Sequence, residues 1–130
     1  MILFLITSCE QEKENIPDLS TPEAAWKTSF SAHFQRNAEL ILDVFSHEIL
    51  ATYGNNREEQ LKFIKQHWKG LKKDKKSRLE IIRTEYIDDT HANVFYNQFV
   101  GSKLWAENMR VLMIKEDGKW KVALDEKAFT

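Results

Sequence analysis

In the first half of the chain, apolar residues recur every three or four positions, which is the period of an amphipathic helix. Trp26, Phe30 and Phe34 share one face of the first predicted helix. Its start is marked by Thr21, whose hydroxyl can cap free backbone N–H groups, and by Pro22, which suits the first helical position. The pattern breaks at residues 35–37, so this helix is expected to end there.

Two more helices are expected before residue 78. A shorter one covers about 38–46, and a longer one begins at Asn56 as its cap and carries Ile64 and Trp68 on its apolar face. Between them, residues 47–53 are expected to form a short extended piece that ends at the turn cluster 54–56.

From residue 78 onward the period changes from 3.6 to 2, and aliphatic, aromatic and β-branched residues predominate. Strands are predicted over 79–87, 92–100, 103–115 and 119–124. Asp117-Gly118 between the last two is a strong signal for a tight hairpin. Three helices followed by an antiparallel meander predict an α+β domain.

The opening residues have a pattern of their own. An apolar run over 1–6 is too short to cross a bilayer and turns abruptly polar after Cys9. The sequence Ile6-Thr7-Ser8-Cys9 resembles the lipobox of bacterial lipoproteins. That resemblance implies that residues 1–8 are the remnant of a signal peptide and that Cys9 is acylated and anchors the chain to a membrane. The alternative is that this segment is an ordinary buried strand.

An acidic stretch follows the cysteine. Five acidic residues and one basic residue give residues 10–23 a charge of −4, and so hydrophilic a segment cannot bury enough surface to order itself. We expect residues 9–19 to be the lipidated cysteine and a tether, and 20–130 to be one folded domain. The expected location is the cell envelope, at an outer membrane, on its periplasmic or its surface-facing side.

The motifs at the two ends of the folded part suggest a family. Residues 21–25 (TPEAA) and 117–122 (DGKWKV) are similar to a lipoprotein family of unknown function within the nuclear-transport-factor-2-like superfamily, also called SnoaL-like. The resemblance implies a cone, in which three N-terminal helices pack into the bend of a curved antiparallel sheet. Members of this superfamily include isomerases, polyketide cyclases and modules without activity, so the fold alone does not choose a function.

Composition removes several classes of function. The chain has 130 residues, with 19 basic and 20 acidic side chains, and its net charge of −1 argues against a broadly basic nucleic-acid binder. One cysteine excludes an intramolecular disulfide framework. The four histidines fall on different elements without the spacing of metal ligands. We therefore expect no metal, no cofactor and no nucleic-acid partner.

Proton transfer in a cone would need a carboxylate and a hydrogen-bond donor in the pocket. The candidate carboxylates are Glu107, Glu85 and Asp43, and the candidate donors are Tyr96, Tyr86 and His33. The alternative is that Glu85 and Glu107 pair with basic neighbours on a solvated sheet face. Alternation on the third strand gives two sets, one even-numbered and one odd-numbered, and both are apolar enough to face inward.

A basic segment closes the third helix and has a net charge of +5 over residues 69–78. Its cations are Lys69, Lys72, Lys73, Lys75, Lys76 and Arg78. These cations are suited to resting on anionic headgroups. The alternative is a solvated, solubilising helix end.

These observations favour a lipid-anchored, non-catalytic binding or accessory module of the cell envelope. The alternative is a small-molecule enzyme of the steroid-isomerase or polyketide-cyclase type that uses the cone's pocket. Homodimerisation through the sheet face is also expected from the resemblance. An outward row of Trp105, Met109 and Met113 would suit it. The alternative is that most of the aromatic residues, Trp105 among them, form the core between the helices and the sheet.

Overall fold

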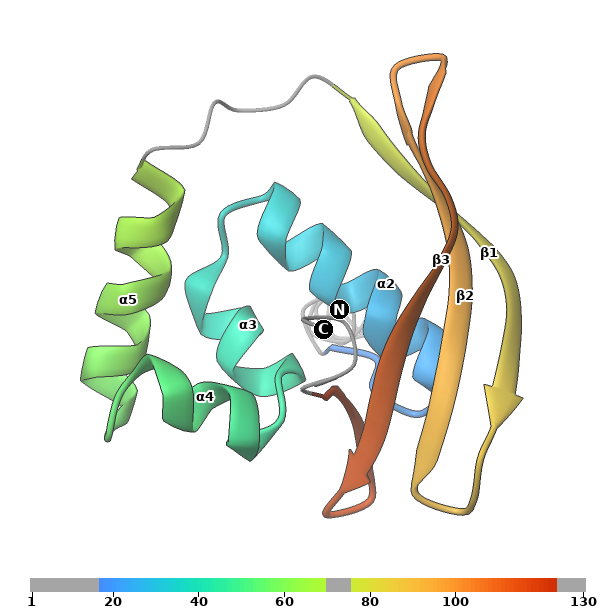
Figure 1. Cartoon of the computed structure of the whole chain (residues 1–130). Coiled ribbons are helices and arrows are strands. Elements are labelled where there is room, and N and C mark those ends of the chain that lie inside the picture. The colour runs from blue at the N-terminus through green and yellow to red at the C-terminus, as the bar shows by residue number, and fades with distance from the viewer. Residues whose placement is uncertain (1–16, 70–75, 124–130) are drawn as a thin grey trace, which may run out of the picture.

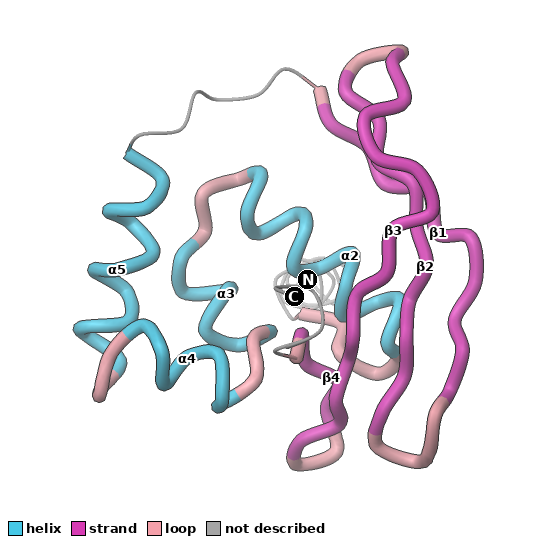
Figure 2. Tube along the Cα trace, viewed as in Figure 1, coloured by secondary structure: helices cyan, strands magenta, loops and turns pink. Residues whose placement is uncertain are grey.

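The computed structural model describes residues 17–69 and 76–123, which form an α+β domain of helices and a curved antiparallel sheet (Figure 1). The expectations for the signal-peptide remnant 1–8, for Cys9 and for most of the tether lie outside these residues, as do those for Lys72, Lys73 and Lys75. Four helices precede four strands in the described part, where the sequence led us to expect three helices (Figure 2).

The helices begin at capping side chains. They are α2 (Pro22–Phe34), α3 (Ala38–Val44), α4 (His47–Tyr53) and α5 (Arg57–Lys69). Thr21, Asn37, Ser46 and Asn56 each accept, through a side-chain oxygen, the backbone N–H of the residue three positions later. Each cap satisfies a donor that the first helical turn leaves unpaired.

The expectation of an extended piece over 47–53 was wrong, because this segment is helix α4. Ser46 caps it and Glu48 lies in its first turn, next to the positive end of the helix dipole. Ile49 and Leu50 are buried, which adds the tertiary packing that a helix of two turns needs.

The sheet has the order β1-β2-β3-β4, all antiparallel, with β1 (Ser77–Tyr86), β2 (His91–Val100), β3 (Lys103–Glu116) and β4 (Lys119–Val122). Asp117 and Gly118 join the last two strands with φ angles of 52° and 78°, the pattern of a type I′ turn. At the β2–β3 turn only Gly101 has a positive φ, 64°, as a type II′ turn requires of its first central residue.

Two irregularities in the pairing of β2 with β3 interrupt the alternation along β3: one at Asn108 and one at Trp105, which has no partner between Leu104 and Ala106. Tyr96 pairs with Met109, but Gln98 pairs with Ala106, so two β3 residues stand opposite Asn97. The extra residue is Asn108, whose φ is 49° and whose N–H donates to Oδ1 of Asn97 at 2.8 Å. A bulge of this kind bends the strand and exchanges the faces of the residues beyond it.

The structure corrects two expectations for β3. Neither the even-numbered nor the odd-numbered set of β3 keeps to one face over the whole strand. Met113 is 0% exposed in the core, whereas Met109 is 44% and Trp105 is 73% exposed. The three therefore form no common outward row, and Trp105 is not a core residue.

Two clusters make up the core. One lies between α2 and the sheet and includes Val94, Met113 and Trp120, and α2 contacts all four strands. The other lies among the helices, where Ile41, Ile64 and Trp68 meet; α5 contacts α3 and α4. The helical layer farthest from the sheet is thus joined to it through α2 and α3 (Figure 1).

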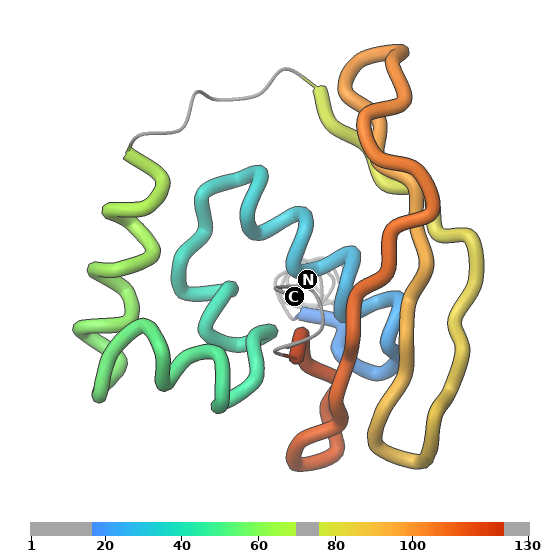
Figure 3. Tube along the Cα trace, viewed as in Figure 1, coloured from blue at the N-terminus to red at the C-terminus, as the bar shows by residue number. Residues whose placement is uncertain are grey.

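Part of the segment expected to be a tether is folded. Leu19 is buried in the core cluster against the sheet, and its carbonyl accepts the N–H of Trp120 at 2.9 Å. Figure 3 shows the start of the described chain beside its last strand.

Candidate functional site

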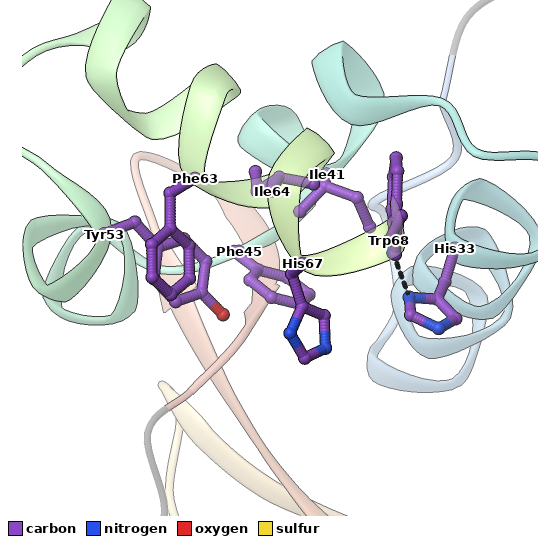
Figure 4. Close-up of a pocket in the computed structure, with 8 residues that line it drawn as sticks. All are labelled: His33, Ile41, Phe45, Tyr53, Phe63, Ile64, His67 and Trp68. Carbon is purple, nitrogen blue, oxygen red and sulfur yellow. Dashed lines mark hydrogen bonds between the residues drawn. The ribbon is translucent and has the colours of Figure 1, made fainter. Parts of the chain in front are cut away.

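A pocket of about 150 Å³ lies within the helical layer (Figure 4). All four helices, and Phe45 just after α3, contribute its lining: His33, Ile41, Phe45, Tyr53, Phe63, Ile64, His67 and Trp68. It differs from the site that the resemblance implies, because no strand residue lines it. Six of the eight side chains are aliphatic or aromatic, and their polar atoms are the phenol oxygen of Tyr53 and the indole nitrogen of Trp68. None of the eight is a carboxylate.

One wall of this helical-layer pocket is a hydrogen-bonded pair. The indole N–H of Trp68 donates to Nδ1 of His33 at 3.1 Å, and the two rings meet edge to face. Because an indole nitrogen only donates, Nδ1 accepts, and neutral His33 carries its proton on Nε2. The guanidinium of Arg36 lies 5.6 Å from the centre of the Trp68 ring and donates to the carbonyl of His33 at 3.1 Å, which braces the pair.

The opposite wall is aromatic. The rings of Tyr53 and Phe63 stack with centroids 4.5 Å apart and an interplanar angle of 18°, and Phe45 lies 6.3 Å from Tyr53. Burial raises the pKa of the Tyr53 phenol, so the hydroxyl stays protonated at neutral pH. His67 lies between this stack and the Trp68–His33 pair (Figure 4).

This lining suits a small, neutral, largely apolar molecule. A ring bound between the walls would have apolar contacts on two sides and the imidazole of His67 beside it for a hydrogen bond. A cavity of this size in another protein accommodates benzene. Without a carboxylate in the lining, the pocket lacks the general base that the proton-transfer hypothesis assigned to Glu107, Glu85 or Asp43.

The structure does not bring those three carboxylates together. Glu107 is exposed on β3 beside the bulge, and Asp43 is exposed on α3, where its backbone carbonyl accepts from Nζ of Lys121. Glu85 is exposed on β1 and pairs with Arg83 at 3.2 Å, as the salt-bridge alternative expected.

The proposed donors are also dispersed. Tyr96 is half-buried on β2, 5.0 Å from the ring of Trp26, and burial raises its pKa. Tyr86 is exposed at the far end of β1, against Trp120. Of the three expected donors, only His33 lies in the helical-layer pocket.

Sequence reasoning missed Tyr53, Phe63 and His67 as a group. Phe63 and His67 are four residues apart on α5, so they share an edge of its apolar face, and this spacing was visible in the sequence. The place of Tyr53 beside Phe63 and His67 could not be predicted, because residues 47–53 were expected to be extended.

Other parts of the described chain offer less. No three His, Cys, Asp or Glu side chains gather as metal ligands in residues 17–69 and 76–123. Two further depressions, of about 360 and 370 Å³, lie at the α4–α5 turn and beside Leu19; the second includes the exposed carboxylate of Asp18. Of the basic segment, Lys69 ends α5, and Lys76 and Arg78 lie at the start of β1; all three are exposed.

None of the described helices has both the length and the apolar character needed to span a bilayer. No family model matches the chain, and no curated protein is significantly similar to it. Among solved structures, it is similar to a de novo designed protein with a curved β-sheet, with a TM-score of 0.46 and 14% identity over 78% of this chain and 93% of the other.

It is also similar to a SEC-C motif-containing protein from Psychrobacter arcticus, with a TM-score of 0.53 and 16% identity. That match covers 89% of this chain and 66% of the other, so the chain spans slightly less than two thirds of that protein. At this identity the likeness concerns the fold alone.

Proposed function

We propose that this protein is a lipid-anchored module of the cell envelope that binds small apolar molecules without catalysis, built on a nuclear-transport-factor-2-like cone. The observation that carries the binding role is the helical-layer pocket, which is aromatic on two sides and has no carboxylate in its lining. Apolar pockets with a few polar groups are the usual form of small-molecule sites. The anchor rests on the lipobox-like residues that end at Cys9.

Binding is tested with phenol as the probe, because it is a single ring with one hydrogen-bonding group. Ligand-observed NMR should show saturable binding at about millimolar concentration, as expected of so small a molecule. Ile64→Phe places a ring in the pocket and should abolish binding. Ile82→Phe, the same change on an exposed strand residue, should leave it intact. Equal binding by both variants would refute the site.

One observation favours the enzyme alternative: His33, His67 and Tyr53 line the same pocket and can all exchange protons. Against it, Nδ1 of His33 is engaged by Trp68. His67→Gln keeps a hydrogen-bonding side chain but removes the base. If the protein turns over a ketosteroid and this variant does not, the enzyme is supported and the binding role is incomplete.

The anchor is tested by expressing the chain and its Cys9→Ser variant in a bacterium. The parent should fractionate with membranes and label with a palmitate analogue, and the variant should do neither. We also propose, from the family resemblance, that two copies pair through the outer sheet face, which carries Phe95, Leu112 and Ile114. Sedimentation of the Cys9→Ser chain should then show a dimer, and a monomer at all concentrations would refute the pairing.

A further inference from the structure

The β2–β3 hairpin extends past the helices (Figure 1). Its tip carries the most exposed large apolar side chain of the described residues. Trp105 is 73% exposed, and its neighbour Leu104 is 46% exposed. Because folding leaves both side chains largely in water, they contribute little to the stability of the domain. Nothing in the packing of the domain explains their presence at the tip.

Three cations lie at the same end of the sheet. The carbonyl of Lys76 accepts the N–H of Gly101 in the hairpin turn at 2.8 Å, so the start of β1 is fastened to the tip. Arg78 pairs with Phe99 across the strands, and its guanidinium lies 4.2 Å from the centre of that ring. Lys103 begins β3 directly after the turn.

The outermost part of this end of the sheet is positively charged. Residues 76–79 and 98–106 contain Lys76, Arg78 and Lys103 and no aspartate or glutamate, so their net charge is +3, and the first acidic residues along β1 and β3 are Glu80 and Glu107. An exposed tryptophan and leucine with cations beside them are the side chains that favour an anionic lipid interface. The rings and alkyl groups enter the headgroup region while the cations meet phosphates.

We propose that the tip of the β2–β3 hairpin is a membrane-docking element that inserts Trp105 and Leu104 into an anionic lipid surface. A protein partner fits less well, because a stable interface needs about 800 Å² on each side and these two side chains supply only a few hundred. The element depends neither on the helical-layer pocket nor on acylation of Cys9, so it goes beyond the proposed function.

The test uses the full chain with Cys9→Ser, so that no acyl group contributes to binding. It should co-sediment with vesicles of phosphatidylglycerol and phosphatidylcholine and not with phosphatidylcholine alone. Trp105→Ala should weaken binding to the vesicles at least about tenfold, since it removes the largest apolar side chain that would enter the lipid. Lys76→Ala and Lys103→Ala should each weaken it about fivefold. Raising the salt from about 0.05 to about 0.5 M should release the protein.

Matched controls come from the opposite end of the sheet. Ile87, 60% exposed in the β1–β2 turn, and Lys119, after the β3–β4 turn, are changed to alanine and should leave binding unaltered. Vesicles with brominated acyl chains should quench the parent's fluorescence, and the Trp105→Phe variant should bind within about threefold of the parent without that quenching.

Three results would overturn the proposal. The first is that the parent does not bind anionic vesicles, and the second is that Trp105→Ala binds them as well as Ile87→Ala does. The third is that Trp105→Ala changes the oligomeric state in sedimentation while vesicle binding stays the same, which would assign the tip to a second copy of the chain. Failure of phenol binding or of acylation would leave the vesicle result unchanged, so the membrane-docking proposal is tested independently of the proposed function.

Discussion

Met113 and Met109 lie four residues apart on one face of β3, because the pairing with β2 is unbroken between them, and they differ in burial, which makes them a matched pair for a stability experiment. Met113 is 0% exposed and its Cα pairs with those of Ala92 on β2 and Val122 on β4, in the middle of the core against α2. Met109 is 44% exposed near the bulge. The same substitution, methionine to alanine, therefore probes two environments on one strand.

The expected cost at Met113 follows from the atoms removed. Alanine lacks the Cγ, Sδ and Cε atoms of methionine, and about 0.8 kcal/mol for each buried group gives roughly 2.4 kcal/mol of lost transfer free energy. The cavity adds to this loss, because neighbours on three elements do not collapse fully, and measured Met→Ala costs in cores reach about 2–5 kcal/mol. We expect Met113→Ala to lower the free energy of unfolding by about 3–4 kcal/mol, and Met109→Ala by less than about 1 kcal/mol.

Urea denaturation followed by far-ultraviolet circular dichroism measures both. With a slope of about 1–3 kcal/mol per molar urea, Met113→Ala should move the midpoint by at least about 1 M, and Met109→Ala should barely move it. Equal costs at the two positions would mean that both side chains face the same environment. That result would refute the placement of Met113 in the core and of Met109 at its exposed margin.

Three further predictions concern single local features. Hydrogen bonds, above all from the backbone N–H of Thr90, lower the pKa of Asp88 from 3.8 to about 2. The stability that they contribute is therefore present above pH 3.8 and is lost as the pH falls toward 2. Asp88→Asn should flatten that part of the curve of stability against pH, and an unchanged curve below pH 3.8 would contradict this prediction. Thr21→Ala removes the cap that accepts the N–H of Ala24 at 3.1 Å and should cost about 1 kcal/mol in urea denaturation, whereas Thr21→Ser should cost little. Gly118→Ala places a Cβ at a φ of 78° and should lower the thermal midpoint by an amount equivalent to about 1 kcal/mol; no change would argue against the type I′ turn.

The elements that sequence reasoning located correctly are those whose signal is local. Two to four consecutive residues specify each of these signals. They are the caps at Thr21 and Asn56 and the turn at Asp117-Gly118, and the structure has each where it was expected. The period-2 pattern likewise located all four strands.

The errors concern features that depend on partners distant in the chain. Helix α4 is two turns long and depends on burying Ile49 and Leu50 against other elements, which its own seven residues do not reveal. The bulge at Asn108 depends on the side chain of Asn97 on the neighbouring strand. The helical-layer pocket needs side chains from four helices at once, so no single motif could indicate it.

The hydrogen bond between Leu19 and Trp120 places the two ends of the described chain side by side. A short linker from residue 123 back to residue 19 would therefore close the domain into a ring with little strain. New ends could then be opened in the exposed turn at 101–102. Such a circular permutant would carry its termini at the far end of the sheet, so a fusion partner could be placed at either end of the molecule.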